Sequence, residues 1–251
     1  MTRKAVILAA GMGTRLRPLT DSEHKCMTKV CGVPIIYHAL DCLEKCGFSE
    51  VVIVVGYLKK QLESQIQNFH MNMKIRFAEN DLYNQTNTAY SLKLGLDKMD
   101  NFDELYILEG DVFFDDVVLK RLITEKHPNA TILEHYNPEL DGTFASLNKE
   151  GFVVDWRHKS EQEPGYTLTD KYKTVNLHRF SAAFVKEILI AENERLIESM
   201  GCNQPLEKTM RQIVSQDPMQ IKGVILNKER WFEIDDLRDL EYAEQLFGKE
   251  Q

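Results

Sequence analysis

The sequence predicts an α/β protein in which a mostly parallel sheet is flanked by helices. Three observations support this fold class. Short apolar or β-branched runs recur at Ala5–Ala10, Glu50–Val55 and Glu104–Glu109. Segments with helical periodicity separate the runs, and a glycine follows each run directly. Strand, helix and strand at this spacing are typical of parallel strands joined by right-handed crossovers.

The first half of the chain alternates strands with helices. Ala5–Ala10 is too short for a helix and fits a strand buried on both faces. The apolar periodicity of Ile35–Cys46 predicts a helix, which Gly47 ends. The next unit is expected to contain the strand Glu50–Val55, a helix over Lys59–Asn68 and a strand at Lys74–Ala78.

The second half is expected to contain several strands separated by turn residues, and then helices. Phe184, Ile188 and Ala191 are predicted to form the apolar side of its first helix. The predicted strands are Ala130–Leu133, Thr143–Leu147, Gly151–Trp156 and Tyr172–Phe180, the helices are Ala182–Met200 and Gln204–Ser215, and a short strand near Trp231 leads into a C-terminal helix.

The first glycine loop has the composition of a phosphate-binding site. Gly11 and Gly13 allow the backbone amides to converge on an anion, and Arg15 and Arg17 add guanidinium groups that match phosphate oxygens. A dinucleotide-binding loop would need a third glycine where Leu16 stands, and a Walker loop would need G-x-x-x-x-G-K-[ST]. A strand-to-helix turn with solvated arginines is the simpler alternative.

A longer motif favours phosphate binding over that alternative. L-A-A-G-x-G-T-R-L-x-P-L-T, at Leu8–Thr20, resembles the signature of the sugar-phosphate nucleotidyltransferase superfamily. The resemblance implies a Rossmann-like, mostly parallel mixed sheet, the nucleotidyltransferase fold, with a small acceptor-binding subdomain. It also implies that the loop wraps the triphosphate of a nucleotide through Ala10, Gly11, Met12, Gly13, Thr14 and Arg15.

The same resemblance assigns a lysine to the α-phosphate. Family members carry it in a P-K-x-L/M segment, and this chain has His24-Lys25-Cys26-Met27. Lys25 and Arg15 are therefore the expected catalytic cations, with His24 in the place of the usual proline. If Lys25 acts as a preorganised charge stabiliser, its removal is expected to lower turnover by about 100-fold or more.

The segment Asn80–Leu92 is expected to bind the base. The pattern N-x-x-Y-x-x-x-N-x-x-Y-S-L resembles the cytidylyltransferases that activate phosphocholine and related head groups. Asn80 and Asn87 are candidates for hydrogen bonds to a pyrimidine edge, because an amide both donates and accepts. Thr88 follows as the expected cap of a helix, and CTP is the expected nucleotide.

The resemblance also implies a magnesium site. Asp111 follows the strand Glu104–Glu109, and Asp235 matches the family's second metal aspartate in E-I-D. Mg²⁺ prefers such hard oxygen ligands. Asp236 is expected to cap the C-terminal helix instead.

Residues near Lys173 are expected to bind the acceptor. The motif Y-K-T-V-N resembles the acceptor side of phosphonate- and head-group-activating members, and it makes Lys173 and Asn176 the candidates. An edge-strand lysine is the alternative for Lys173. Trp156 is a candidate for an acceptor ammonium group, which aromatic faces or acids would hold, although aromatic residues more often pack a core.

Together these expectations describe a single domain over residues 1–251, with a nucleotide-binding half to about residue 127 and an acceptor-binding half from about residue 128. The expected reaction transfers CMP from CTP to phosphocholine, phosphoethanolamine, 2-aminoethylphosphonate or a related compound. A UTP- or dTTP-dependent sugar-1-phosphate nucleotidyltransferase and a non-catalytic nucleotide-binding regulatory module are the alternatives. A homodimer and a fusion to a further enzyme domain both stay open.

Composition argues against other classes of partner. The net charge is −8, from 31 basic and 39 acidic residues, and it shows no nucleic-acid footprint. No apolar run approaches the about 18–20 residues of a membrane span, and no signal peptide is visible. The five cysteines contain no C-x-x-C pair, which indicates reduced thiols and a cytoplasmic location.

Overall fold

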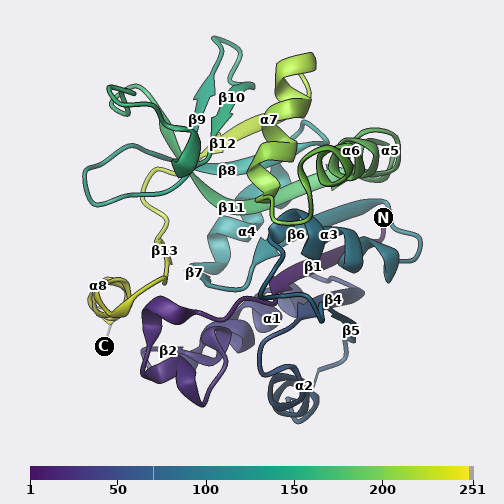
Figure 1. The fold of residues 1–251 in the computed structure, drawn as a ribbon, viewed down its shortest axis with the longest axis vertical. Helices are drawn as coiled ribbons and strands as arrows, with labels where there is room; N and C mark the ends of the chain where they lie inside the picture. Colours follow the sequence, from purple (N-terminus) through teal and green to yellow (C-terminus); the bar gives the residue numbers. More distant parts are fainter. Residues whose placement is uncertain (70, 249–251) are drawn as a thin grey trace.

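A computed structural model, which describes residues 1–69 and 71–248, shows a central mixed sheet with helices on both faces (Figure 1). The parallel part of this sheet follows the spatial order β6-β1-β4-β5. Each of these strands pairs in parallel with its neighbour. Their bounds are Glu104–Glu109 for β6, Arg3–Ala9 for β1, Glu50–Val55 for β4 and Lys74–Glu79 for β5. The predicted parallel sheet is therefore confirmed.

The second part of the sheet is mainly antiparallel. β11 (Tyr172–Ser181) pairs with β6, and β8 and β9 both pair with β11. Within the described residues nine strands form this one sheet, which runs through both halves of the chain. The remaining bounds are Ala130–His135 for β8, Phe144–Leu147 for β9, Val153–Arg157 for β10 and Lys222–Ile225 for β12.

The helices divide between the two faces of the sheet. α1, α2 and α4 bury their apolar sides in one hydrophobic core, whereas α3, the segment from α5 through the π-helical turn η5, and α7 bury theirs in another. α6 continues directly from η5 and packs on α3 and α7. The bounds are Ile35–Lys45 for α1, Lys59–Gln67 for α2, Thr88–Asp97 for α3, Asp116–Thr124 for α4, Ala182–Phe184 for α5, Val185–Leu189 for η5, Ile190–Met200 for α6 and Leu206–Gln216 for α7.

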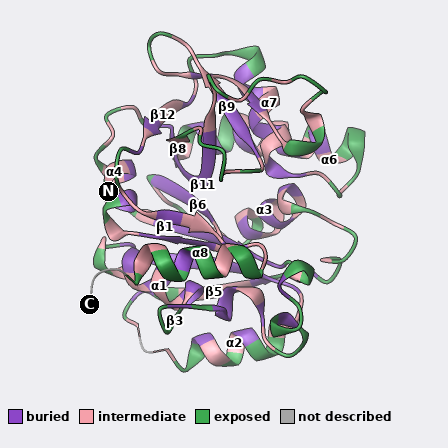
Figure 2. Ribbon diagram, turned by 90° about the vertical axis from the view of Figure 1, so that its left-hand side faces the viewer, coloured by how far each residue is buried: buried purple, intermediate pink, exposed green. Residues whose placement is uncertain are grey.

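The strand periodicity explains why there are two cores. Ile7 and Ile53 face the first core and Val6 and Val52 face the second, because successive strand side chains point to opposite faces. Figure 2 shows the central strands buried between helices whose outer faces are exposed. Burying a side chain such as Ile53 stabilises the fold by about 1.5–3 kcal/mol.

A third, smaller core joins segments that are distant in sequence. It contains Leu16 from the glycine loop, Phe113, Ile234 and Ala243. The elements it connects are α1, β2 (Lys29–Val30), β7 (Val112–Phe114), β13 (Trp231–Glu233) and α8 (Leu237–Phe247). The short strand β3 (Val33–Pro34) pairs with β2. This core brings the C-terminal segment against the glycine loop, where the candidate site lies.

Some elements differ from the sequence prediction. α4, β7 and β12 were not predicted. β12 contains Gly223 and forms through its parallel pairing with β8, which is a tertiary contact. The predicted helix Ala182–Met200 contains the π-helical turn η5, whose longer repeat shifts the buried side of the helix. Ala191 is consequently exposed, and Leu189 and Leu196 are buried instead.

None of the helices in the described part of the chain combines the length and the apolar character needed to cross a membrane.

Candidate active site

A cavity of about 170 Å³ opens beyond the carboxyl ends of β1 and β6, the place where ligands bind in open α/β sheets. Segments from four parts of the sequence form its wall. They are the glycine loop, the turn with Lys25, the segment that leads into α3, and the end of β6. Of the predicted site residues, those in the wall are Ala10, Gly11, Gly13, Lys25, Asn80, Asn87, Thr88 and Asp111.

The glycine loop has the special backbone that its sequence predicted. Gly13 is left-handed, with φ of 57°, and begins the 3₁₀ turn η1 (Thr14–Leu16). A Cβ at Gly13 would lie 2.8 Å from Cβ of Lys25, so the loop packs directly on the lysine stem. Gly11 is exposed, and, apart from Gly11 and its two chain neighbours, no atom of the described residues lies within 4 Å of the place its Cβ would take. The loop is therefore held at Gly13 and open at Gly11.

Lys25 joins the two aspartates expected to bind a metal. Its Nζ lies 2.6 Å from Oδ2 of Asp111 and 2.7 Å from Oδ1 of Asp235. Nη2 of Arg15 lies 2.8 Å from the other carboxylate oxygen of Asp235. The four predicted charged residues thus form one connected group, in which the cations contact carboxylates of the protein itself.

Backbone pairing explains how Asp111 and Asp235 meet. β13 and β7 pair antiparallel, with Glu233 opposite Val112, and the amide of Ile234 donates to the carbonyl of Asp111 at 2.9 Å. Asp111 follows the end of β6, so this pairing carries Asp235 to the same edge of the sheet. Asp236 caps α8 in a capping box with Asp239, as predicted.

The site shifts the pKa of Lys25 and of Asp235. Burial lowers the pKa of Lys25, but the carboxylates of Asp111 and Asp235 outweigh it and raise that pKa above the ordinary lysine value. Burial raises the pKa of Asp235, but Lys25 and then Arg15 outweigh it and hold that pKa below its ordinary value. Both groups are therefore charged at neutral pH.

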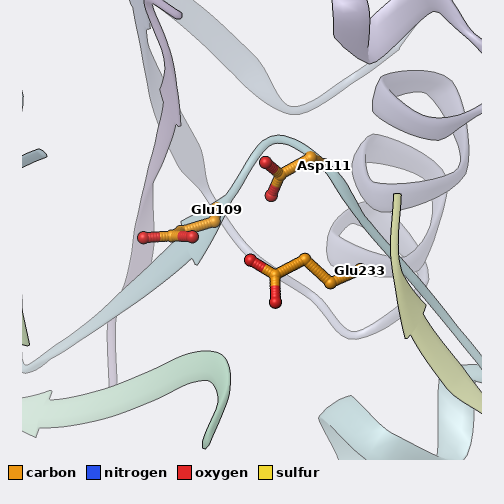
Figure 3. A group of neighbouring side chains, drawn as sticks. All are labelled: Glu109, Asp111 and Glu233. Atoms are coloured by element: carbon orange, nitrogen blue, oxygen red, sulfur yellow. The ribbon is translucent and has the colours of Figure 1, made fainter. Parts of the chain in front are cut away.

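Two glutamates that were not predicted lie beside Asp111. Carboxylate oxygens of Glu109, Asp111 and Glu233 lie within 4.8 Å of one another, and Figure 3 shows the three side chains around a common space. Burial, followed by the nearby charge of Glu207, raises the pKa of Glu109 well above its ordinary value. Glu109 and Glu233 each lie two residues before a predicted aspartate, in E-G-D and E-I-D, and this repeated spacing is the signal that could have found them.

Lys173 lies inside the sheet and not at its edge. It is 2% exposed, and β11 pairs with strands on both sides, so the edge-strand alternative is wrong. Its Nζ donates to Oε2 of Glu233 at 3.0 Å and to the carbonyl of Thr174 at 2.8 Å, and it lies 5.6 Å from the centre of the Trp231 ring. The lysine thus neutralises one of the glutamates next to the site.

Asn176 reaches the same group of carboxylates, whereas Trp156 does not. Nδ2 of Asn176 donates to Oε2 of Glu109 at 3.0 Å. Trp156 is completely buried in the second core, with its ring 5.6 Å from that of His178. The structure therefore contradicts the prediction that Trp156 holds an acceptor, because its ring presents no face to the cavity.

The segment before α3 is ordered by its own hydrogen bonds. Nδ2 of Asn80 donates to the hydroxyls of Thr86 and Ser91, at 2.9 and 3.2 Å, and its Oδ1 accepts from an amide of the same segment. Asn87, and not Thr88, caps α3, so the predicted cap was one residue late. Oγ1 of Thr88 instead accepts from the amide of Leu206 at 2.8 Å.

His24 takes the place of the proline that the resemblance leads one to expect. Its Nδ1 accepts from the amide of Cys26 at 3.2 Å and caps the 3₁₀ turn η3 (Lys25–Met27). Burial lowers the pKa of His24 to about 4, so the ring is neutral at physiological pH. A neutral histidine thus orders the turn that carries Lys25.

Known proteins resemble this chain, one of them over almost its whole length and another over less than half of it. CMP-5'-(3-aminopropyl)phosphonate synthase of Streptomyces rubellomurinus is 28% identical over 245 residues, which is 98% of this chain and 39% of that protein. Choline-phosphate cytidylyltransferase of Streptococcus pneumoniae is 36% identical over 108 residues, or 43% of this chain and 44% of that protein. The matched regions span less than half the length of these two relatives.

A solved structure shows the same fold. The inositol-1-phosphate CTP transferase from T. maritima superposes with a TM-score of 0.77 at 20% identity, covering 99% of this chain and 96% of that one. At this identity the likeness establishes the architecture alone. It confirms the predicted α/β fold with a mostly parallel mixed sheet and flanking helices.

A family model described as "Nucleotidyl transferase" matches residues 4–136. The match covers more than half of the 251 residues and includes the glycine loop, Lys25, the segment before α3 and Asp111. The chain therefore belongs to the nucleotidyl transferase family.

Proposed function

We propose that this member of the nucleotidyl transferase family is a Mg²⁺-dependent cytidylyltransferase that transfers CMP from CTP to a small phosphorylated or phosphonate head group. The acceptors we favour are phosphocholine, phosphoethanolamine and 2-aminoethylphosphonate. Family membership implies a nucleotide and a phosphorylated acceptor. The names of the two relatives and of the similar structure refer to CMP, CTP or cytidylyl transfer, which supports a cytidine nucleotide here.

The arrangement of Lys25 carries the proposal. One ammonium group contacts Asp111 and Asp235 and also lines the cavity under the glycine loop. A nucleotide whose phosphates enter that cavity would meet Lys25, the loop amides and the two carboxylates together. Such a grouping of a cation, backbone donors and metal-binding oxygens suits the positioning and electrostatic stabilisation that phosphoryl chemistry needs.

Asp111 and Asp235 have the chemistry that a magnesium ion needs. Their hard carboxylate oxygens are the ligands that Mg²⁺ prefers, and Oδ1 of Asp111 is buried with no hydrogen-bond partner among residues 1–69 and 71–248. When bound, the ion would supply positive charge against the triphosphate. We propose that these two aspartates hold it.

In the proposed reaction, an oxygen of the acceptor's phosphate or phosphonate attacks the α-phosphorus of CTP. A new P–O bond forms, the bond to the β-phosphate oxygen breaks, and pyrophosphate leaves with the electron pair. The acceptor oxygen is already ionised near neutral pH, so the step needs no strong general base. Lys25 and Arg15 are proposed to stabilise the charge on the α-phosphate, and the loop Ala10–Thr14 is proposed to hold the remaining phosphates.

The other predicted residues divide between base and acceptor. Asn87 is exposed at the cavity wall and is proposed to contact the cytosine with Thr88, whereas Asn80 shapes the segment that carries them. Asn176 is proposed to lie on the acceptor side of the site, where its amide contacts the carboxylate of Glu109. Lys173 is proposed to add positive charge to the acceptor side while Glu233 holds it.

The test is magnesium-dependent pyrophosphate release with CTP, UTP, dTTP and ATP, each combined with phosphocholine, phosphoethanolamine, 2-aminoethylphosphonate and glucose-1-phosphate. Release with CTP and one amine-bearing acceptor is the expected result. Release only with UTP or dTTP and the sugar phosphate would replace the proposal with a sugar-1-phosphate nucleotidyltransferase. CTP binding without release in any combination would favour a regulatory module.

A further inference from the structure

The position between Asp111 and Asp235 is filled by a group of the protein itself. Nζ of Lys25 lies 2.6 and 2.7 Å from one oxygen of each aspartate, which are hydrogen-bonding distances for a charged pair. The lysine side chain is largely buried, with 12% of its surface exposed. An ammonium ion therefore occupies the place between the two proposed metal ligands.

We propose that Lys25 is an internal counter-ion, which occupies the divalent-cation position between Asp111 and Asp235 and leaves it only when nucleotide phosphates arrive. The inference rests on the proposed function for the identity of the cation and of the nucleotide. It assigns to Lys25 a second role, because the residue then controls when the metal can bind.

Charge explains why the lysine and a metal ion exclude each other. Lys25 engages one oxygen of each aspartate, and Arg15 engages the second oxygen of Asp235. A divalent ion that entered beside Lys25 would be repelled by its charge at close range. If Lys25 left without a new partner, a largely buried cation would lose its compensating charges, which is strongly unfavourable.

The cavity provides the new partner within reach of the lysine. Lys25 lines the same cavity as Gly11 and Gly13, where the proposed phosphates would lie. The backbone turn that carries the lysine is held by the cap from His24 to Cys26, so the movement can be confined to the side chain. Metal and nucleotide are consequently expected to bind as a pair, and the metal alone weakly.

The experiment measures Mn²⁺ binding without nucleotide by electron paramagnetic resonance, with Mn²⁺ as the paramagnetic substitute for Mg²⁺. Lys25→Met is expected to bind Mn²⁺ about tenfold or more tightly than the wild type, since the ion no longer displaces a charged hydrogen-bonding group. Lys173→Met is the matched control. It removes the same charge from a buried lysine that contacts Glu233 but neither Asp111 nor Asp235.

A second measurement tests the transfer of Lys25 to the phosphates. In EDTA, Lys25→Met is expected to bind CTP about tenfold or more weakly than the wild type, whereas Lys173→Met should change this affinity less. One substitution then strengthens metal binding and weakens nucleotide binding. Thermal melting followed by circular dichroism checks that each variant is folded. If Lys25→Met does not fold, both measurements are made on Lys25→Gln instead.

Three results would overturn the inference. They are an unchanged or weaker Mn²⁺ affinity in Lys25→Met, an equal gain in Lys173→Met, and an unchanged metal-free CTP affinity in Lys25→Met. The CMP-transfer assay of the wild type tests the proposed function independently of the counter-ion role. A wild type without CMP transfer refutes the proposed function, whereas normal transfer with unchanged Mn²⁺ affinity in Lys25→Met refutes only the counter-ion role.

Discussion

The side-chain amide of Asn176 donates a hydrogen bond from Nδ2 to Oε2 of Glu109 at 3.0 Å and so links β11 to the carboxyl end of β6. Asn176 has a φ of 60°, the left-handed region, at a point where the pairing of β11 with β8 shifts register. An irregularity of this kind re-aims a side chain within a sheet. Here it aims the amide at a carboxylate next to Asp111.

Two substitutions at Asn176 separate its backbone role from its hydrogen bond. Asn176→Gly loses the hydrogen bond and keeps a residue that tolerates positive φ, whereas Asn176→Ala loses both. We expect the alanine variant to be less stable than the glycine variant by about 1 kcal/mol, measured by urea unfolding. Both should raise the KM for the acceptor more than the KM for CTP. Equal stabilities would show that the left-handed backbone is not strained.

The two glycines of the loop should respond differently to alanine. Gly13→Ala places a Cβ 2.8 Å from Cβ of Lys25 at a left-handed position, so we expect the thermal midpoint to fall and turnover to fall with it. Gly11→Ala adds a methyl group to open space and should leave the thermal midpoint nearly unchanged. It should weaken CTP binding if phosphates occupy that space, and unchanged CTP affinity in Gly11→Ala would argue against this placement of the triphosphate.

Substitutions of the neighbouring acids Asp235 and Asp236 should have different effects, one on turnover and the other on stability. Asp235→Asn is expected to lower turnover by about 100-fold or more, because a charged ligand next to Lys25 is lost. Asp236→Ala removes the cap of α8 and should cost about 1 kcal/mol of unfolding free energy, with turnover at moderate temperature close to the wild type. Steady-state kinetics and urea unfolding of both variants check this, and similar turnover losses would contradict the division of roles.

Buried His178 should make stability depend on pH. Burial lowers the pKa of His178 to about 3, from 6.5 in the unfolded chain, and its Nδ1 lies 2.8 Å from Oγ1 of Thr131. Between these values the unfolded chain binds the extra proton, so stability falls as the pH falls. From pH 7 to pH 5 this histidine should cost about 2 kcal/mol of unfolding free energy.

His178→Gln isolates that contribution, because glutamine can keep the hydrogen bond to Thr131 and does not titrate. The loss of unfolding free energy between pH 7 and pH 5 should be about 2 kcal/mol smaller in the variant than in the wild type. Chemical unfolding at the two pH values measures it. Equal losses in both proteins would show that His178 takes up its proton in the folded state.

The strands and helices that the sequence predicted best are those with a strong local pattern. Glu50–Val55 and Glu104–Glu109 were predicted with their observed bounds, because runs of apolar and β-branched residues ended by glycine leave few alternatives. β12 was missed because it depends on pairing with β8. The buried side of α6 was misplaced because the preceding π-helical turn shifts its phase.

In the candidate site, too, the sequence identified residues in local motifs and missed those that depend on tertiary contacts. The motifs identified Arg15, Lys25, Asp111 and Asp235, since each motif is a short continuous stretch, and the structure brings all four together. The sequence also suggested Trp156, which is completely buried in the second core and is not part of the cavity wall. Glu109 and Glu233 were not singled out, because their importance comes from their proximity to each other.

The sequence by itself determined the α/β class, the glycine loop and the identity of the charged residues, because these depend on local periodicity and on the chemistry of single side chains. Only the tertiary structure decided which of the charged side chains contact one another. The pairing of β13 with β7 and the third core carry Asp235 to Asp111, and Lys25 then lies between them. Such contacts join segments far apart in the chain, and they form only when burial of the cores compensates for the entropy of bringing those segments together.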